Sequence, residues 1–326
     1  YTIVNGSETA GVNIDKDSVT LLGKDSASTI IDPPGASTLS GLFGIYADTQ
    51  LSLIIKNLAV VGAYDGIHFR NVDSSYVTGD SFSYNGNAGI SMTDDGDSNR
   101  IATNSFIGNT SYGVFLQVNM NNNLLDNNVA SSTGTGFFVG SPTGNSTDNT
   151  FKNNTATSNS DGVHISGGGS TSNTVTGNTV SSSSNRGIMI NSANNNTVDS
   201  NRVTSTTNEG IFMNSASSCL VRNNVAVSNG VGIRINSATG NRLYQNLIQT
   251  SVLAGIRIGA NSNRIDQNDV IGGDTGVWLD NSATSNVITK NNITGSNVSS
   301  VYNSVGASQD LTRNWFGSTD SVAIKN

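Results

Sequence analysis

Charged and aromatic side chains are scarce in this sequence, and their scarcity excludes several classes of protein. Only 12% of the residues are charged and 6% are aromatic. Lys and Arg are scattered and the formal net charge is −7, so no basic surface for nucleic acid or an anionic membrane is indicated. No apolar run approaches the roughly 20 residues that a membrane helix needs, and no signal peptide is visible at the start. We therefore expect no nucleic-acid partner and no membrane insertion.

Cysteine and proline are nearly absent. Cys219 is the only cysteine, so no disulfide exists within the chain and the cysteine count does not set the redox compartment. We interpret Cys219 as a small residue in a polar turn. Among the few prolines, Pro33 and Pro34 mark a loop, and no stretch rich in Pro or charge breaks the chain. We expect one domain over residues 1–326, with less regular coils over 1–65 and regular repeats over 66–326.

Gly, Ser, Thr and Asn dominate the composition in place of the missing types. This composition excludes a helical bundle and is typical of a turn-rich all-β chain. A disordered chain is excluded as well, because aliphatic residues recur at regular intervals along the sequence.

Two short phrases recur and interleave. The pattern Asn-x-aliphatic-x-x-Asn-x-aliphatic begins at Asn99, Asn122, Asn149, Asn173, Asn196, Asn241, Asn263 and Asn286. A Gly-aliphatic phrase begins at Gly66, Gly89, Gly113, Gly136, Gly162, Gly187, Gly210, Gly232, Gly255 and Gly276. The repeat is too short for a propeller blade of about 40 residues and has no helical period.

Each repeat contains three short apolar alternations joined by Asn, Ser and Gly turns, which predicts three strands in one triangular coil. Stacked coils about 4.8 Å apart form a parallel β-helix, a solenoid in which alternate side chains point inward. The recurrent Asn suits a tight corner, because Asn tolerates the left-handed backbone conformation and its side chain can bond the equivalent Asn in the next coil.

With these phrases the chain resembles the NosD-like class of right-handed parallel β-helix repeats, which is found in many secreted and cell-surface proteins. The resemblance implies an all-β, right-handed parallel β-helix with three short strands per coil and about 22–25 residues per coil. It is unspecific for activity. Such proteins often begin with a capping helix, and an opening at Tyr1-Thr2-Ile3-Val4 predicts an uncapped first coil whose free backbone groups invite another chain. Trp315 and Phe316 resemble the phrase that often closes the last coil of this class, and we expect their bulk to plug the interior.

The outward position of the Gly-aliphatic strand predicts one file of side chains. It contains Tyr46, His68, Ser91, Phe115, Phe138, His164, Met189, Phe212, Arg234, Arg257, Trp278 and Tyr302. Four apolar members, Phe115, Phe138, Met189 and Phe212, are unusual on a solvated face. The stripe is explained by protein contact, by stacking of sugar rings, or by loops that fold over it.

Catalysis requires clustered acids and bases, and the sequence shows no such set. His68 and His164 occur in the same phrase, Asp-Gly-aliphatic-His, but four coils of roughly 4.8 Å separate them. Arg234 and Arg257 stack on adjacent coils beside Glu209 alone. We therefore expect no enzymatic activity and no cofactor, apart from a weak indication that Asp94, Asp95 and Asp97 hold Ca²⁺.

The function that we predict from the sequence is that of a non-enzymatic extracellular or cell-surface structural protein, a rod that assembles with itself into a filament, sheath or surface layer. The alternative is a carbohydrate-active or carbohydrate-binding β-helix, similar to a polysaccharide lyase or epimerase. Seven sequons offer glycosylation sites in a secreted protein, at Asn5, Asn109, Asn145, Asn153, Asn195, Asn292 and Asn297.

Overall fold

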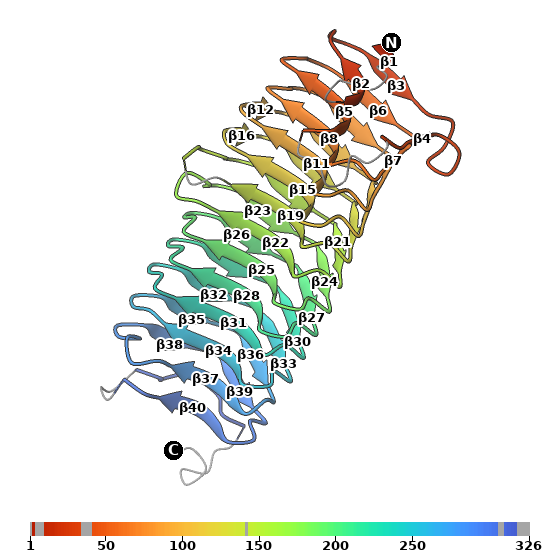
Figure 1. Ribbon diagram of the computed structural model, residues 1–326. Helices are drawn as coiled ribbons and strands as arrows, with labels where there is room; N and C mark the ends of the chain where they lie inside the picture. Colours follow the sequence, from red (N-terminus) through yellow and green to blue (C-terminus); the bar gives the residue numbers. More distant parts are fainter. Residues whose placement is uncertain (1, 4–9, 34–40, 141–142, 306–309, 318–326) are drawn as a thin grey trace. The chain divides into compact units, whose positions relative to one another are not determined.

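The computed structural model describes residues 2–3, 10–33, 41–140, 143–305 and 310–317 (Figure 1). The chain divides into two compact units, Tyr1–Thr174 and Val175–Asn326. Each unit is a stack of coils, and each regular coil contributes one strand to each of three parallel sheets, A, B and C. The described residues contain no helix that is long and apolar enough to cross a membrane. The predicted all-β parallel β-helix is confirmed, and the prediction of one domain stays a prediction.

Unit 1 contains the first strands of each sheet. Sheet A consists of β1 (Thr2–Ile3), β2 (Ala10–Ile14), β5 (Phe43–Asp48), β8 (Asp65–Arg70), β11 (Ala88–Thr93), β15 (Tyr112–Gln117), β19 (Thr135–Gly140) and β22 (Asp161–Ser166). Sheet B consists of β3 (Thr20–Leu22), β6 (Ile54–Lys56), β9 (Tyr76–Thr78), β13 (Arg100–Ala102), β17 (Leu124–Asp126) and β20 (Thr150–Lys152). Sheet C consists of β4 (Ile30–Ile31), β7 (Ala59–Val61), β10 (Ser81–Ser83), β14 (Ser105–Ile107), β18 (Val129–Ser131) and β21 (Thr155–Thr157). A further parallel pair is formed by β12 (Gly96–Asp97) and β16 (Met120–Asn121).

Unit 2 repeats this arrangement. Sheet A consists of β25 (Arg186–Asn191), β28 (Glu209–Asn214), β31 (Val231–Asn236), β34 (Ala254–Gly259), β37 (Thr275–Leu279) and β40 (Ser299–Asn303). Sheet B consists of β26 (Thr197–Asp199), β29 (Leu220–Arg222), β32 (Arg242–Tyr244), β35 (Arg264–Asp266) and β38 (Val287–Thr289), while β23 (Thr174–Thr176) begins at the last residue of unit 1. Sheet C consists of β24 (Thr179–Ser181), β27 (Arg202–Thr204), β30 (Val225–Val227), β33 (Leu247–Gln249), β36 (Asp269–Ile271) and β39 (Asn292–Thr294).

The interior of each coil is filled by alternate side chains of the strands. Ile188 and Ile190 of β25 are fully buried, as the period of two residues predicts. Phe82 and Phe106 stack on each other inside unit 1, with ring centroids 5.4 Å apart. Each such buried side chain contributes on the order of 1.5–3 kcal/mol, so stability accumulates coil by coil.

The glycine of the Gly-aliphatic phrase is required by close backbone approach. A Cβ atom at Gly136 would lie 2.6 Å from the carbonyl oxygen of Gly162, the same slot in the next coil. At Gly232 the corresponding distance to the Gly255 oxygen is also 2.6 Å. Any side chain here would therefore push neighbouring coils apart.

Buried asparagines form ladders at the corners of the coils. In unit 1, Oδ1 of Asn128 accepts from the backbone N–H of Asn104 at 3.0 Å, and its Nδ2 donates to the carbonyl of Ile101 at 2.8 Å. In unit 2, Oδ1 of Asn224 accepts from the backbone N–H of Asn201 at 2.9 Å. Each amide thus satisfies backbone groups of a neighbouring coil in a site that water does not reach, and the predicted ladder is confirmed.

The left-handed corner, however, belongs to the residue before each ladder asparagine. Asn127 has a φ of 54° and precedes Asn128, while Ser200 has a φ of 58° and precedes Asn201. The sequence prediction assigned both roles to one residue. It also placed one copy of the phrase at Asn122, which has a φ of 57° and precedes the ladder residue Asn123. The turn and the amide thus occupy successive positions, and the first of them is Asn or Ser at these corners and Gly at others, such as Gly177 before Asn178.

The first and last described coils differ from the expectation. β1 pairs with β2 in antiparallel fashion, so a short strand covers the outer edge of the first long strand in sheet A. Near the other end, the backbone N–H of Ile293 donates to the carbonyl of Trp315, and the Trp315 side chain is 48% exposed. Trp315 therefore does not plug the interior.

Candidate functional site

The predicted outward file exists in sheet A of each unit. In unit 1 the strand register pairs Tyr46 with His68, His68 with Ser91, Ser91 with Phe115, Phe115 with Phe138, and Phe138 with His164. In unit 2 it pairs Met189 with Phe212, Phe212 with Arg234, Arg234 with Arg257, Arg257 with Trp278, and Trp278 with Tyr302. Each repeat forms one coil, so equivalent side chains of successive repeats lie next to each other across the strands of sheet A.

Aromatic rings form a continuous surface on sheet A of unit 1. The rings of Phe115 and Phe138 lie 5.3 Å apart, and Tyr112 stacks on Phe115 with centroids 4.3 Å apart. Phe138 in turn contacts His164 edge to face at 5.1 Å. Phe115 and Phe138 remain partly exposed, so part of this aromatic surface is open to solvent.

A histidine and a buried carboxylate form a dyad in β8. Nδ1 of His68 lies 2.9 Å from Oδ2 of Asp65, which is only 2% exposed. Oδ1 of Asp65 accepts from Nδ2 of Asn87 at 2.8 Å and from the backbone N–H of Ala88 at 3.1 Å. Since a carboxylate that accepts all these bonds needs a donor from the ring, we assign the proton of His68 to Nδ1. Nε2 then carries the lone pair and has no hydrogen-bond partner among the described residues.

The ring of His68 is held in place by stacking. Phe43 lies parallel to it with centroids 4.2 Å apart, and Tyr46 lies 5.9 Å away. Phe43 occupies the slot just before the glycine of β5, as Tyr112 does in β15. The sequence prediction followed only the slot after the aliphatic residue and missed both rings.

A phenol, a carboxylate and a guanidinium lie together beside the dyad. Tyr46 donates to Oδ2 of Asp48 at 3.3 Å, and Nη2 of Arg70 lies 2.8 Å from the same oxygen. Burial and the negative charge of Asp48 raise the pKa of Tyr46, against the opposing effect of Arg70, so the phenol keeps its proton at neutral pH. The hydrogen bond to Asp48 raises the pKa of Arg70. Unit 1 therefore brings a base, an acid and a positive charge onto two adjacent strands.

The second copy of the phrase is looser. Nδ1 of His164 lies 3.8 Å from Oδ2 of Asp161, beyond hydrogen-bond distance. The strands β8 and β22 are four steps apart in sheet A, so His68 and His164 are separated by about 19 Å. As predicted, they do not form one site.

In unit 2 the apolar part of the file is covered by arginine side chains. Met189 is 7% exposed and Phe212 is 5% exposed. The guanidinium carbons of Arg186 and Arg234 lie 5.0 and 5.3 Å from the centroid of the Phe212 ring. Glu209 joins them, with Oε2 3.2 Å from Nε of Arg186 and Oε1 2.8 Å from Nη1 of Arg234. Of the explanations that the sequence left open, coverage of the stripe holds for these two residues, with arginine side chains on Phe212 and Met189 in place of loops.

The file ends in an arginine followed by two aromatic rings. Arg257 contacts Asp280 through Nε and Nη2, each at 3.0 Å, and its guanidinium lies 4.6 Å from the Trp278 ring. The prediction had found no carboxylate for Arg257, because Asp280 lies two residues beyond Trp278, the residue that faces Arg257 in the next coil. Trp278 contacts Tyr302 edge to face at 5.3 Å, and Tyr302 is 49% exposed.

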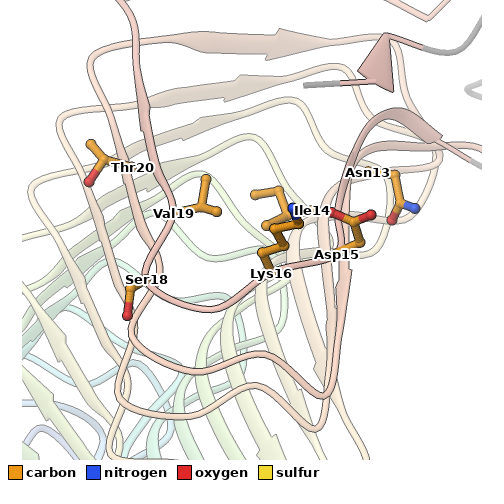
Figure 2. A pocket seen from close by; sticks show the side chains of 7 residues that line it. All are labelled: Asn13, Ile14, Asp15, Lys16, Ser18, Val19 and Thr20. Atoms are coloured by element: carbon orange, nitrogen blue, oxygen red, sulfur yellow. The ribbon is translucent and has the colours of Figure 1, made fainter.

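A separate cavity of about 630 Å³ lies in the first coil (Figure 2). It is lined by Asn13, Ile14, Asp15, Lys16, Ser18, Val19 and Thr20. Figure 2 shows one carboxylate, of Asp15, and one ammonium group, of Lys16, on its wall. Of these residues, Asn13 pairs with Tyr46 in the register of β2 and β5, so the cavity borders the outward file at one position.

The described residues contain no group of three or more His, Cys, Asp or Glu side chains that is arranged to hold a metal. This holds for Asp94, Asp95 and Asp97, the weak Ca²⁺ indication. Asp94 and Asp95 are exposed at a turn, while Oδ1 of Asp97 accepts from the backbone N–H and from Nδ2 of Asn121.

The predicted glycosylation sites differ in access. Asn109 is 1% exposed and its Nδ2 donates to the carbonyl of Phe82, so the folded coil has no room for a glycan there. Asn292 is half-buried, and Asn5 lies outside the described residues. The remaining sequons are exposed, at Asn145, Asn153, Asn195 and Asn297.

Two models of known protein families match this chain. A family model described as "Right handed beta helix region" matches residues 10–179, and one described as "Periplasmic copper-binding protein (NosD)" matches residues 143–272 and 205–326. The chain belongs to the NosD-like family of right-handed parallel β-helix proteins. No curated protein sequence matches it.

Solved structures with the same fold act on or recognise other molecules. The mannuronan C-5 epimerase AlgE4 A-module of Azotobacter vinelandii is 13% identical with a TM-score of 0.60, covering 94% of this chain and 91% of that chain. The catalytic domain of a GH87 α-1,3-glucanase is 13% identical with a TM-score of 0.63, covering 96% and 62%. The tailspike receptor binding domain of Siphovirus 9NA is 12% identical with a TM-score of 0.56, covering 82% and 53%. At such identities the likeness shows the fold.

These comparisons overturn the expectation that the chain is not an enzyme. The solved structures that share its coils include an epimerase and a glucanase. The expectation rested on the absence of the sequence motifs of known β-helix enzymes. Such motifs do not reveal that His68, Asp65, Tyr46 and Arg70 lie together on adjacent strands. Self-association into a filament, sheath or surface layer stays a prediction.

The residues of this chain do not fit the copper site that the family description implies. Copper in proteins is held by clustered His, Cys and Met ligands, whereas His68 and His164 lie four coils apart. Burial raises the pKa of the Cys219 thiol to about 11, which disfavours the thiolate that binds metal.

Proposed function

We propose that this protein is a carbohydrate-active enzyme that binds a uronate-containing polysaccharide along sheet A of unit 1 and transfers protons at the carbon next to the sugar carboxyl group. One observation carries the proposal: the dyad of His68 and Asp65 lies on the strand next to Tyr46, within a file of aromatic rings. The fold shared with the mannuronan C-5 epimerase A-module supports the choice of substrate class.

The roles of the residues follow from their protonation. Nε2 of His68 takes the proton from the carbon, and the C–H electron pair moves into the sugar carboxyl group. Asp65 keeps the imidazole in the required tautomer and stabilises the imidazolium that forms. Arg70 supplies positive charge near the developing negative charge.

Tyr46 supplies the second proton. If its O–H protonates the same carbon, the sugar is epimerised. His68 then gives its proton to solvent, and the Tyr46 phenolate takes one up from solvent. If the O–H instead protonates the glycosidic oxygen on the neighbouring carbon, that C–O bond breaks and a C=C bond forms, which is a lyase reaction. The stacked rings of Phe43 and Tyr46 provide the platform on which a sugar ring lies.

The location that we propose is outside the cytoplasm, in the periplasm or beyond the cell. The family description of a periplasmic protein and the polysaccharide substrate support this.

The proposal is tested by incubating the protein with polymannuronate, polygalacturonate and neutral glucan. Proton abstraction predicts incorporation of solvent deuterium at the carbon next to the carboxyl group, with unsaturated products absorbing in the ultraviolet if the enzyme is a lyase. His68→Ala removes this activity, while the matched variant His164→Ala retains it. No exchange with any uronate polymer, or equal loss in both variants, contradicts the proposal.

A further inference from the structure

Unit 2 carries a second feature of sheet A that the proton-transfer site does not use. We propose that Arg234, Arg257, Trp278 and Tyr302 form a binding face for the anionic groups of an acidic polysaccharide. The face lies on β31, β34, β37 and β40. The choice of a polysaccharide as the ligand rests on the proposed function, whereas the binding itself is independent of catalysis.

The two units have opposite charge. Residues 1–174 contain 6 Lys and Arg against 15 Asp and Glu, a net charge of −9, and residues 175–326 contain 10 against 8, a net charge of +2. Eight of the ten arginines belong to unit 2. Because unit 1 repels a polyanion on average, affinity for one must come from local positive groups.

Arg234 and Arg257 place two positive charges side by side. They are direct neighbours in the register of β31 and β34, an arrangement of like charges that is unfavourable unless something lies between them. Glu209 and Asp280 flank the pair from opposite sides, at Arg234 and at Arg257. An anion held by both guanidinium groups relieves the repulsion.

Both guanidinium groups retain donors for such an anion. Arg234 uses Nη1 for Glu209, and Arg257 uses Nε and Nη2 for Asp280. No described residue accepts from Nη2 of Arg234 or from Nη1 of Arg257. Each side chain is 26% exposed, so these donors are reachable from solvent. The two oxygens of a carboxylate or sulfate group can accept one charge-assisted hydrogen bond from each arginine.

The aromatic rings next to the two arginines indicate that the rest of the ligand is a sugar. Trp278 follows Arg257 directly in the register and Tyr302 follows Trp278. Tyr302 is half-exposed, and aromatic faces bind the C–H faces of sugar rings. The repeat of about 4.8 Å per strand suits a polymer of sugars that meets one such group after another. Among anions, this favours an acidic glycan over an isolated phosphate or carboxylate.

The inference is tested by measuring binding of polymannuronate, dextran sulfate, neutral dextran and a single-stranded oligo-dT to the full chain by calorimetry. The test variant is Arg234→Gln/Arg257→Gln. Its matched control is Arg242→Gln/Arg264→Gln, which removes the same charge from the pair that holds Asp266 on sheet B.

We expect the wild type to bind at least one of the anionic glycans and not dextran. We expect the test variant to bind at least about tenfold more weakly, since two charge-assisted hydrogen bonds are lost. The control variant should stay within about twofold of the wild type because it keeps the proposed face. Tyr302→Ala, which leaves the charge unchanged, should also weaken glycan binding.

Several results would contradict the inference. Equal losses in the two double variants reduce the effect to general charge, and equal binding of dextran or oligo-dT removes the specificity for an acidic glycan. Each of these results overturns the inference, as does a wild type that binds no anionic glycan. His68→Ala distinguishes the two proposals, because it should abolish turnover and leave binding to unit 2 unchanged. Binding without turnover in the wild type defeats the proposed function alone.

Discussion

The backbone N–H of Asp80 donates to Oδ1 of Asn104 at 3.0 Å, so Asp80 occupies a ladder position, and it brings a carboxyl group where the next coil has an amide. Oδ1 of Asp80 accepts from the N–H of Leu58, while Oδ2 is buried and has no partner among the described residues. In the next coil, Nδ2 of Asn104 donates to the carbonyl of Val77. A protonated Asp80 can donate in the same way, and an ionised one cannot.

Asp80 should therefore make stability depend on pH. Burial raises its pKa from 3.8 to about 7. Because the folded-state pKa lies above the unfolded one, this contribution is fully present below about pH 4 and is lost as the pH rises through 7. We expect the free energy of unfolding to fall by on the order of 2–4 kcal/mol between pH 4 and pH 8, measured by urea denaturation.

Asp80→Asn is the matching variant. It should remove most of this pH dependence and stabilise the protein at pH 8 by about 1–3 kcal/mol, because the amide donates without a proton from solvent. The exposed Asp94→Asn serves as control. An unaltered slope between pH 4 and pH 8 in Asp80→Asn would show that another group titrates.

Cys219 occupies a ladder position in unit 2. Its backbone N–H donates to Oδ1 of Asn241 at 2.8 Å, and its sulfur lies 3.6 Å from the carbonyl of Ala193. With a pKa of about 11, the buried thiol should not react with a thiol reagent at pH 8 in the native protein and should react after unfolding. We expect Cys219→Asn to fold and to be more stable by about 1 kcal/mol. Rapid labelling of the native protein would contradict the buried position.

Asn201 supports two neighbouring coils at once. Its Oδ1 accepts from the backbone N–H and from Nδ2 of Asn178, and its Nδ2 donates to the carbonyl of Val175 and to Oδ1 of Asn224. Asn201→Ala should cost about 1–3 kcal/mol of stability, because buried donors lose their partners. Thermal unfolding measures this, with the exposed Thr179→Ala as control, and equal melting temperatures in the two variants would refute the ladder's contribution.

Asp65→Asn tests how His68 is oriented. An amide at this position can present N–H to Nδ1 of His68, which places the imidazole proton on Nε2 and removes the base. We expect at least about a hundredfold loss of turnover, with little change in polysaccharide affinity. Asp161→Asn should leave turnover within about twofold, since its histidine belongs to a different part of the file. Equal effects of the two substitutions would place the reaction elsewhere.

Most of the fold could be predicted from the sequence, because each repeat closes one coil and equivalent residues of successive repeats therefore lie next to each other in a sheet. The burial of Ile188 and Ile190 and the file from Tyr46 to His164 in unit 1 follow from this rule alone. The exchange of an amide for a carboxyl group at Asp80 or a thiol at Cys219 is also visible once the ladder positions are known. The error at Asn122 shows where this reasoning fails. With three successive asparagines, the sequence does not show which of them occupies the ladder position.

The candidate site could not be predicted in the same way. Contacts such as that of Phe43 with His68 join different slots of adjacent coils, and the choice between them depends on how each side chain turns. The same holds for Arg186 and Arg234, which fold onto Phe212 and convert an expected apolar surface into a charged one. The repeat predicts the position of each Cα atom, whereas the conformation of the side chain depends on its neighbours.

The glycine slot has a further consequence for how such a chain changes length. Because the glycine slot meets the same slot of the next coil, as Gly136 meets Gly162, loss or duplication of one whole repeat inside a unit keeps this backbone contact. Partial insertions would instead shift inward side chains to the outside. Evolution can therefore lengthen or shorten the spacing between functional groups in fixed steps, and the paired phrases at Asp65 and Asp161 have the form that such copying would leave.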